Sequence, residues 1–459
     1  MKGAEGVKGA EDMESLKPVS RSRPTLPHAP LPPAPSPGRR GGALLVVTLG
    51  LLACGSDPDG TGDPGAAGAT GEGAADTGAG AGPATTTTGS SSSGSGGGGA
   101  PAGKVPMFVA QGGVGRTTVS CDDGKTWVGD HAWDTDADPL MCGSAQSAVC
   151  YDGTCSYQVG GDCIQMTCCD HSPDVAKGVV FGDGQLVATW GWGQPGEVRR
   201  STNGIDWTTT HANDTFGGLA YGGGRFVLSS RSPFWSTDGA AWTAGSLADF
   251  KNADGSDMWS VRRFAYADFQ GEGRFVAVAS GDVSRDMLVS SNGGETWWRP
   301  SVIPDDCAGE VSTYGGIVSG DDVILIVDMD GYACRSTDGG DTWSVTQTGL
   351  SMILSHGVWT GSEFWFWGDD GYRASSPDGA TWTVTPMTMP TRLGPVARSD
   401  AGTLVAVGNV WQGYAEQTFY RSTDGLAWEE LEEGSFAPSH PIFYLTFGYA
   451  DPSEVCPAP

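Results

Sequence analysis

The chain has 459 residues, of which 73 are glycine, and its 54 acidic and 26 basic side chains give a net charge of −28. Nucleic acid and anionic membrane surfaces repel such a charge, so we expect neither as a partner. Cationic ligands, metal ions, neutral sugars and proteins remain open. The eleven cysteines leave an even ten if one is lipidated, which suits disulfides in an oxidising compartment.

A short apolar run, ALLVVTLGLLA at residues 43–53, follows two arginines. A basic segment before such a run is typical of a secretory signal peptide, and the run is too short to span a bilayer. It ends in LLACG, which resembles the bacterial lipobox. The resemblance implies that residues 1–53 are removed, that Cys54 is lipidated, and that Gly55 favours the outer membrane or cell surface. The long stretch before the arginines indicates a translation start downstream of residue 1.

Residues 54–104 form a predicted tether. They include TTTTGSSSSGSGGGG and hold almost no large apolar side chain. Such a segment cannot bury enough surface to fold, so we expect a flexible coil with a reach of about 40 Å. Without residues 1–53 the chain keeps 50 acidic and 19 basic residues, a net charge of −31. We expect a monomer that touches the membrane through its N-terminal lipid alone.

One pattern recurs seven times in residues 120–428: Ser, a variable residue, Asp or Asn, Gly one or two residues after that and, a few residues later, Trp. An Asp or Asn side chain accepts backbone N–H groups in a tight turn, and Gly takes the positive φ that other residues resist. Turn chemistry therefore accounts for these acids without a catalytic or calcium-binding role. The Asp and Asn positions are Asp122, Asn203, Asp238, Asn292, Asp338, Asp378 and Asp424.

These repeats look like the Asp-box of sialidase-type and related β-propellers. The resemblance implies a turn between the third and fourth strands of each four-stranded blade, and thus an all-β, seven-bladed propeller over residues 105–459. Steps of 35 to 55 residues between successive box tryptophans fit one blade each. The single step of 80, from Trp127 to Trp207, indicates an insertion at residues 132–176.

The first and last strands are predicted to share a blade. Only two strands, residues 107–111 and 116–120, fit before the first box, so blade 1 lacks its innermost strand. The apolar segment 441–450 after the last box would supply it, which removes the exposed edges. That strand would end on the face that carries the boxes, so we predict a disulfide between Cys121 and Cys456.

Six cysteines crowd into fewer than 30 residues of the insertion and predict three disulfides among fifteen pairings. The run Cys168-Cys169-Asp170-His171 also permits a metal site, although secretion and the even count favour disulfides. Elimination pairs Cys307 with Cys334. We expect no metal and no cofactor. The six cysteines are Cys142, Cys150, Cys155, Cys163, Cys168 and Cys169.

Acidic and aromatic side chains are expected on the opposite, top face. Tryptophans that stack on sugar rings and two carboxylates acting as acid and base would make a glycosidase site, with the carboxylates about 6.5–9.5 Å apart in an inverting enzyme. Ordinary Asp-Gly turns and core tryptophans explain the same residues. The acids are Asp282, Asp286, Asp328, Asp330, Asp369 and Asp370, with Asp305, Asp306 and Glu310 in the adjoining crossing; the tryptophans are Trp190, Trp192, Trp365, Trp367 and Trp411.

The families that share the box differ in function. Sialidases carry an arginine triad and an F/Y-R-I-P motif; the motif is absent here, and Arg200, Arg335 and Arg421 directly precede box serines as in the ordinary repeat. Xyloglucanase-type hydrolases pair two propellers, and one is present here. Photosystem II assembly factors and sortilin-like receptors are similar, non-enzymatic propellers.

We therefore predict a lipid-anchored cell-envelope protein whose propeller is a binding or scaffolding module for protein or glycan. One alternative is a glycoside hydrolase that uses Asp328, Asp330, Asp369 or Asp370. The other is a purely structural envelope protein. Shared fold alone does not decide between them.

Overall fold

The computed structural model describes residues 101–457 with gaps, and two short strands before them, β1 (Thr88–Gly89) and β2 (Ser93–Gly94). The described residues form strands and turns, and none of their segments is a helix long and apolar enough to cross a membrane. The gaps are residues 113–115, 132–148, 152–153, 160–161, 167–175, 191–195, 213–215, 231, 252–254, 256–260, 280–286, 305–306, 308–315, 329, 352, 354–355, 389–391, 409–417 and 432–441.

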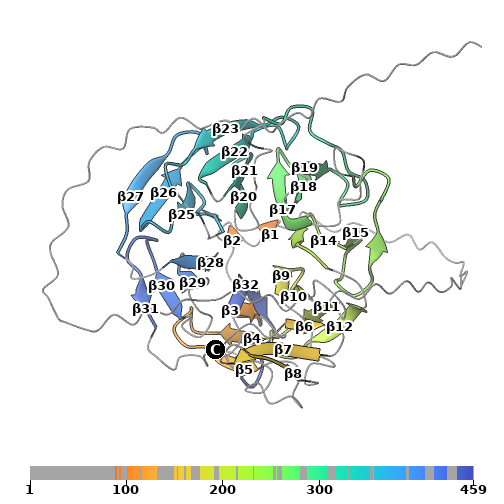
Figure 1. Ribbon diagram of the computed structural model, residues 1–459, viewed down its shortest axis with the longest axis vertical. Coiled ribbons are helices and arrows are strands. Elements are labelled where there is room, and N and C mark those ends of the chain that lie inside the picture. Colours follow the sequence, from red (N-terminus) through yellow and green to blue (C-terminus); the bar gives the residue numbers. More distant parts are fainter. Residues whose placement is uncertain are drawn as a thin grey trace, which may run out of the picture. The chain divides into compact units, whose positions relative to one another are not determined.

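Seven antiparallel sheets, the blades, stand in a ring around a central axis (Figure 1). Within each blade the strands follow one another outward from this axis. Blades 2 to 4 consist of β9 (Ala176–Gly182), β10 (Gln185–Trp190), β11 (Glu197–Ser201) and β12 (Thr208–Ala212); β13 (Leu219–Gly222), β14 (Arg225–Ser229), β15 (Pro233–Ser236) and β16 (Thr243–Ala244); and β17 (Val261–Phe269), β18 (Glu272–Ala279) and β19 (Met287–Ser290). Blades 5 to 7 consist of β20 (Gly316–Gly320), β21 (Val323–Val327), β22 (Tyr332–Ser336) and β23 (Ser344–Gln347); β24 (Val358–Trp359), β25 (Phe364–Trp367), β26 (Tyr372–Ser376) and β27 (Thr383–Pro386); and β28 (Leu393–Arg398), β29 (Leu404–Gly408), β30 (Phe419–Ser422) and β31 (Glu429–Glu430).

Blade 1 joins the two ends of the propeller sequence. Its order is β32 (Ile442–Ala450), β3 (Val105–Gly112), β4 (Thr117–Ser120) and β5 (Val128–His131), so the last strand of the chain is innermost. The predicted closure is therefore confirmed. The disulfides Cys121–Cys456 and Cys307–Cys334 are confirmed as well, with Cα atoms 5.7 Å and 5.4 Å apart.

The hydrophobic core is divided into seven clusters, and each cluster lies between two neighbouring blades. One of them packs Phe108 and Phe447 of blade 1 against Val405 and Phe419 of blade 7, with the Trp127 ring stacked 3.8 Å from that of Phe419. The other six join blades 1–2, 2–3, 3–4, 4–5, 5–6 and 6–7. An open row of seven blades would bury only six interfaces, so the seventh cluster shows that packing, as well as hydrogen bonding, closes the ring.

The seven repeated turns, here called box turns, follow the third strand of each blade at one end of the ring. In six blades they lead to the fourth strand, and in blade 4 they lead to Trp298, which pairs with Val289 of β19 through a single bridge. In the first, Asp122 Oδ1 accepts the backbone N–H of Lys125 and Thr126 at 3.1 and 2.9 Å, and Ser120 Oγ accepts that of Gly124 at 3.0 Å. Gly124 has φ of 83°, a conformation that the missing Cβ permits. The sequence repeats because each blade needs the same turn.

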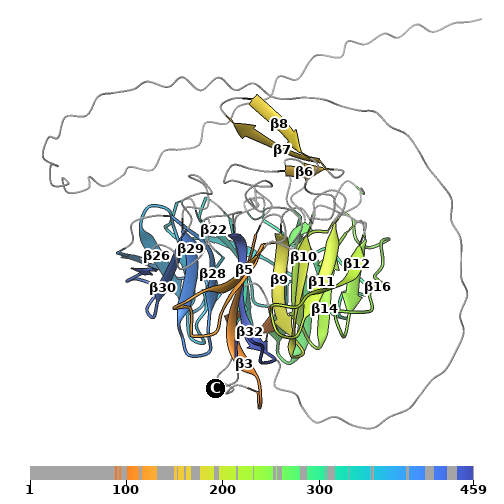
Figure 2. The ribbon, with the colours of Figure 1, turned by 90° about the horizontal axis from the view of Figure 1, so that it is seen from below.

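Two parts of the chain lie outside the blades. The cysteine-rich insertion contains a separate three-stranded sheet of β6 (Val149–Tyr151), β7 (Thr154–Val159) and β8 (Asp162–Met166), which Figure 2 shows apart from the ring. Within the predicted tether, β1 pairs with β13, Gly89 opposite Tyr221, inside the ring (Figure 1). Cys54 and the cysteines Cys142, Cys168 and Cys169 lie outside the described residues.

Candidate functional site

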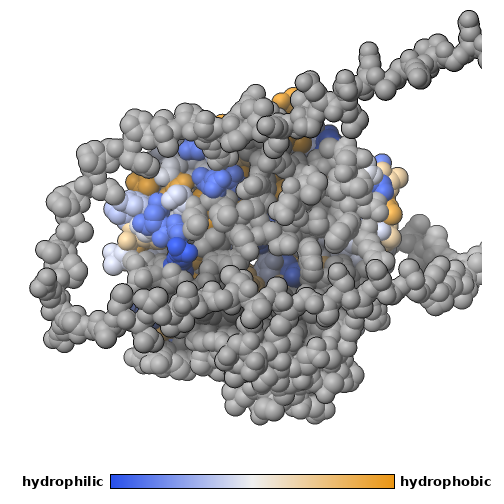
Figure 3. All heavy atoms as spheres, viewed as in Figure 1, coloured by the Kyte–Doolittle hydropathy of each residue, from blue (hydrophilic) through white to orange (hydrophobic). Residues whose placement is uncertain are grey.

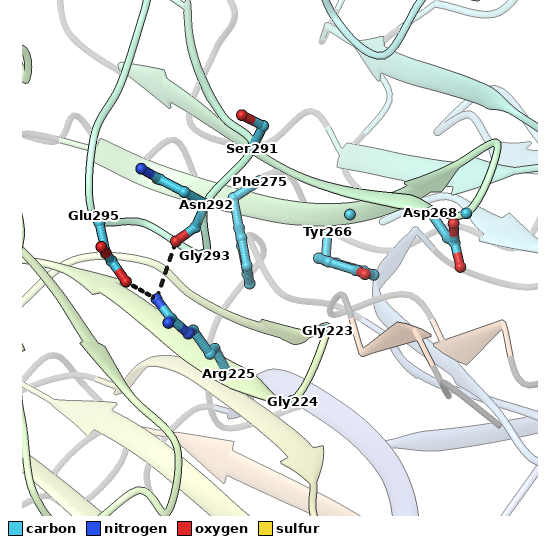
Figure 4. A pocket seen from close by; sticks show the side chains of 13 residues that line it. Gly223, Gly224, Arg225, Tyr266, Asp268, Phe275, Ser291, Asn292, Gly293 and Glu295 are labelled. Carbon is cyan, nitrogen blue, oxygen red and sulfur yellow. Dashed lines mark hydrogen bonds and ion pairs between the residues drawn. The ribbon is translucent and has the colours of Figure 1, made fainter. Parts of the chain in front are cut away.

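A surface pocket of about 650 Å³ lies between blades 3 and 4, at the end of the ring that carries the box turns. Three turns surround it: the β13–β14 turn, the β17–β18 turn and the box turn of blade 4 (Figure 4). Six of its thirteen lining residues are glycines, so much of the wall is bare backbone. Backbone N–H and C=O groups are strong hydrogen-bonding groups, and here no side chain of those residues covers them.

Two glycines make room for the aromatic ring of Tyr266. A Cβ placed on Gly222 would lie 1.9 Å from Cγ of Tyr266, and one on Gly273 would lie 2.4 Å from its hydroxyl oxygen. The ring therefore lies flat against both backbones and packs edge-on to Phe275, with centroids 5.1 Å apart. Both rings are buried, so they form the rigid floor of the pocket rather than its exposed wall.

Arg225 forms one wall and joins the two blades. Its Nη1 donates to the Asn292 carbonyl oxygen at 3.0 Å and to Glu295 Oε1 at 2.6 Å, and its guanidinium carbon lies 4.2 Å from the Trp235 ring centroid. Both hydrogen-bond acceptors, Asn292 and Glu295, belong to the box turn of blade 4. The wall is thus held by a charge-assisted bond across the blade junction.

The electrostatics of the pocket are mild. Burial, helped by the nearby Asp268 carboxylate, raises the pKa of Tyr266 to about 12, so its hydroxyl stays neutral near pH 7. Asp268 and Glu295 lie at opposite ends in Figure 4. The groups that the lining residues offer to a ligand are backbone N–H and C=O groups, two separated carboxylates and the Arg225 guanidinium, all of which can form hydrogen bonds.

The predicted top-face aspartates are placed as turn residues. Asp328 is 7% exposed, and its Oδ1 accepts the Tyr332 N–H at 2.8 Å. Burial raises the pKa of Asp328 to about 6. Asp369 Oδ2 lies 3.2 Å from Arg392 Nη2, while Asp370 Oδ2 accepts the Ser351 hydroxyl at 3.2 Å. Each of these three carboxylates thus has a partner within the protein, and Asp330 is exposed.

The predicted sugar-stacking tryptophans divide into buried and half-buried ones. Trp190 and Trp367 are buried in the clusters between blades 1 and 2 and between blades 6 and 7. Trp365 is half-buried, and the Arg373 guanidinium covers it at 4.2 Å. These rings pack inside the fold and do not offer a free face. Trp192, Trp411, Asp282, Asp286, Asp305, Asp306 and Glu310 lie outside the described residues.

The box acids are held by their own turns. Backbone N–H groups that point at each carboxylate lower the pKa of Asp238, Asp378 and Asp424 below its usual value. Burial acts to raise the pKa of Asp122 and Asp338, but hydrogen bonds from backbone N–H groups and from Thr and Ser hydroxyls outweigh it, so the pKa of both carboxyls is lowered. A carboxylate already satisfied in this way is a turn element. No cluster of three or more His, Cys, Asp or Glu within the described ranges could hold a metal ion.

The sequence placed the expected ligand site at the top face, so the pocket between blades 3 and 4 was not predicted. A usable signal was present: two glycine-rich turns, Gly222-Gly223-Gly224 and Gly271-Glu272-Gly273, occupy equivalent places in successive blades. What remained hidden is that Tyr266 from one blade lies on the glycines of the other, since that contact depends on how the blades pack.

No family model matches the chain, and no curated protein matches it. Among solved structures with a similar fold, YCF48 bound to D1 peptide is 13% identical, with a TM-score of 0.42 over 69% of this chain and 100% of its own. YCF48 from Cyanidioschyzon merolae is 15% identical, with a TM-score of 0.40 over 67% and 93%. Apo AztD from Citrobacter koseri is 8% identical, with a TM-score of 0.38 over 75% and 98%. At these values the likeness is one of fold alone.

Proposed function

We propose that this chain is a lipid-anchored binding module of the bacterial cell envelope, whose propeller holds a protein or glycan ligand in the pocket between blades 3 and 4. The propeller fold is compatible with such a role. The observation that carries the proposal is the pocket itself, with its bare glycine backbone, rigid aromatic floor and absence of paired acids among its lining residues.

The pocket suits an extended polar ligand. Its volume of about 650 Å³ lies within the usual range of ligand sites, and it opens on the surface beside the exposed residues Ser291 and Asn292. Exposed large hydrophobic side chains are scattered over separate parts of the described surface, at Val128, Leu247, Val302, Val384 and Val455. In Figure 3 hydrophilic and hydrophobic residues accordingly form small mixed groups. Recognition would therefore depend on hydrogen bonds more than on an apolar patch.

Anchoring belongs to the same proposal. Lipidation of Cys54 and a tether of residues 54–104 would hold the propeller near the membrane, at the outer membrane or cell surface. The seven box turns support membership of the Asp-box propellers, because all seven use the same Ser and Asp or Asn hydrogen bonds.

The test is a glycan array and a peptide library probed with the full secreted chain and two matched variants. Ser291→Tyr places a large side chain at the mouth of the pocket, and Thr237→Tyr places the same side chain at the equivalent position of the previous box turn. We expect Ser291→Tyr to weaken ligand binding at least about tenfold and Thr237→Tyr to leave it unchanged. Equal binding by both variants, or no ligand on either array, would contradict a binding site in this pocket.

A glycoside hydrolase is the second candidate, and the raised pKa of the buried Asp328, about 6, favours it, because a general acid must hold its proton at a higher pH than an ordinary carboxyl group does. A hydrolase panel on the same chain distinguishes the two functions. Turnover that disappears in Asp328→Asn, Asp330→Asn or Asp370→Asn while Ser291→Tyr stays active would replace the binding proposal.

A further inference from the structure

The pocket between blades 3 and 4 contains a hydroxyl group without a partner. Tyr266 is 3% exposed and lines the pocket. Among the residues that the structure describes, its hydroxyl oxygen makes no hydrogen bond. A tyrosine hydroxyl in so buried a side chain usually has a hydrogen-bond partner. The Tyr266 hydroxyl therefore adds to the backbone groups and carboxylates of the pocket a further group that is free to bind a ligand.

Tyr221, at the equivalent position of blade 3, shows what Tyr266 lacks. Each of the two rings lies against a glycine of the preceding blade, Gly182 for Tyr221 and Gly222 for Tyr266. The backbone of Asp183 forms a hydrogen bond with the Tyr221 hydroxyl. The same arrangement of ring and glycine in the next blade leaves the Tyr266 hydroxyl open to the pocket. An unpartnered hydroxyl is thus a property of this one blade junction and not a necessary result of packing a tyrosine there.

Asp268 lies on the same side of β17 as Tyr266. Side chains alternate along a strand, so residues two apart point the same way. Asp268 is exposed, lines the pocket, and its carboxylate has no hydrogen bond or ion pair with any residue that the structure describes. Its charge acts on the Tyr266 hydroxyl, and Figure 4 shows this hydroxyl directed toward the side of the pocket where Asp268 lies. A carboxylate and a neutral hydroxyl thus face the same space.

The charges of the pocket favour a cation in that space. Its lining holds one guanidinium and two carboxylates, a net charge of −1, and Arg225 Nη1 is already bonded to Glu295 Oε1 at 2.6 Å. The excess charge is therefore that of Asp268, and the net charge of the whole chain, −28, has the same sign. A protonated amine has three N–H donors and no acceptor, so it can donate both to a carboxylate and to the oxygen of a neutral tyrosine.

The walls of the pocket indicate what carries the amine. Its two aromatic side chains, Tyr266 and Phe275, are 3% and 2% exposed, so neither offers a ring face on which a sugar could stack. The bare backbone of the glycine turns instead offers N–H and C=O groups to an extended main chain. We propose that the ligand is an extended peptide segment whose lysine side chain places its ammonium group between Asp268 and the Tyr266 hydroxyl, an inference that rests on the binding function proposed above.

The experiment titrates the full chain with the blocked peptide acetyl-Gly-Gly-Lys-Gly-Gly-amide and follows binding by ligand-observed NMR at constant ionic strength. The same peptide with an Nε-acetylated lysine lacks the charge, and a tetramer of glucosamine carries the amine on a sugar. We expect saturable binding of the lysine peptide. The acetylated peptide should bind at least about tenfold more weakly, because a charge-assisted bond is lost, and the glucosamine tetramer should also bind more weakly than the lysine peptide.

Three variants test the two groups separately. Asp268→Asn should weaken binding of the lysine peptide about tenfold or more, because it removes the charge of the acceptor. Tyr266→Phe keeps the ring on its glycine and should weaken binding about three- to tenfold, the effect of one hydrogen bond. Asp183→Asn is the matched control, since it removes the same charge from the β9–β10 turn of blade 2 and should leave binding unchanged.

The outcomes separate this inference from the proposed function. Equal binding of the lysine and acetyl-lysine peptides, or equal loss in Asp268→Asn and Asp183→Asn, would overturn the ammonium site. Tighter binding of the glucosamine tetramer than of the lysine peptide would overturn the choice of a peptide. A ligand without an amine whose binding Ser291→Tyr weakens would overturn the inference and leave the proposed function standing, whereas both fail if neither the lysine peptide nor any array ligand binds.

Discussion

Five arginines of the described residues cross from one blade to the box turn of the next. Arg421 shows the arrangement: its Nε donates to the Asp123 carbonyl oxygen and its Nη2 to Asp123 Oδ2, both at 2.9 Å. Four others donate in the same way to a box carbonyl, and they are Arg200, Arg225, Arg335 and Arg373. The Asp or Asn of these four boxes therefore has two tasks, since its side chain holds its own turn and its carbonyl binds the neighbouring blade.

Replacing one of these arginines should loosen a blade junction. We expect Arg421→Met to lower the free energy of unfolding by about 1.5–3 kcal/mol, because two hydrogen bonds from a charged donor are lost while the apolar stem is kept. Urea denaturation measures the change. Arg392→Met, which removes a more exposed ion pair with Asp369, is the control and should cost less than about 1 kcal/mol. Equal losses of stability in the two variants would show that the hydrogen bonds from Arg421 to the neighbouring blade stabilise the fold no more than the exposed ion pair does.

Asp328 gives a pH-dependent prediction. Burial raises its pKa from 3.8 to about 6 in the folded protein, so the folded state holds the proton that the unfolded state releases. The stability this provides is present below about pH 4 and is lost as the pH rises through 6. Asp328→Asn, which stays neutral, should therefore gain about 1–2 kcal/mol relative to the parent between pH 4 and pH 7.5. Thermal unfolding at pH 4 and at pH 7.5 measures the difference in stability between the variant and the parent. A difference that is the same at both pH values contradicts the prediction.

The residues that could be predicted from sequence are those whose partners are close in the chain. The box Asp and Ser side chains bind backbone atoms two to four residues away, so their pattern repeats visibly. His356 and Tyr266 gave no such signal. Their surroundings come from blades far away in sequence, and only the packed ring brings Arg263 or Gly222 against them.

At the scale of elements, blade 1 depends on two segments from opposite ends of the propeller. β32 pairs with β3 along its length, from Val105 opposite Ala450 to Gly112 opposite Ile442, and the Cys121–Cys456 disulfide links the same blade beyond the strand. A salt bridge of 2.7 Å between Lys104 and Asp451 adds a further link. Hydrogen bonds, a covalent bond and an ion pair thus converge where the ring would otherwise open.

The two described disulfides should contribute unequally. Cys121 and Cys456 are separated by 335 residues and Cys307 and Cys334 by 27. A cross-link that closes a longer loop restricts the unfolded chain more, by about 2 kcal/mol for this difference. We expect the double variant Cys121→Ser/Cys456→Ser to lose that much more stability than Cys307→Ser/Cys334→Ser in urea denaturation. A larger loss in the second variant would show that native packing around Cys307 outweighs loop closure.

Strand positions were predictable where the alternation was strong. The predicted strands 116–120 and 441–450 each differ by one residue from the observed β4, Thr117–Ser120, and β32, Ile442–Ala450. The outermost strands have no such pattern, and two of them, β16 and β31, have only two residues each. These outer strands are exposed on the rim, so few buried contacts fix where pairing begins.

At the scale of the whole molecule, the net charge of −28 should weaken the fold by self-repulsion. Raising NaCl from about 10 to 150 mM shortens the screening length from about 30 to 8 Å, so we expect the melting temperature to rise. KCl should act equally at the same ionic strength, because screening does not depend on the cation. A melting temperature that falls would show that the ion pairs outweigh the repulsion.

The strand order of blade 1 also sets when the protein can finish folding. During synthesis β3, β4 and β5 emerge first, yet their innermost partner β32 emerges last. Until then β3 keeps an unpaired edge, and such an edge invites pairing with other chains. A chain that ends before residue 442 would therefore keep the unpaired edge of β3 and would be prone to aggregate. The edge of β3 is thus protected from proteases and from pairing with other chains only after β32 has been synthesised.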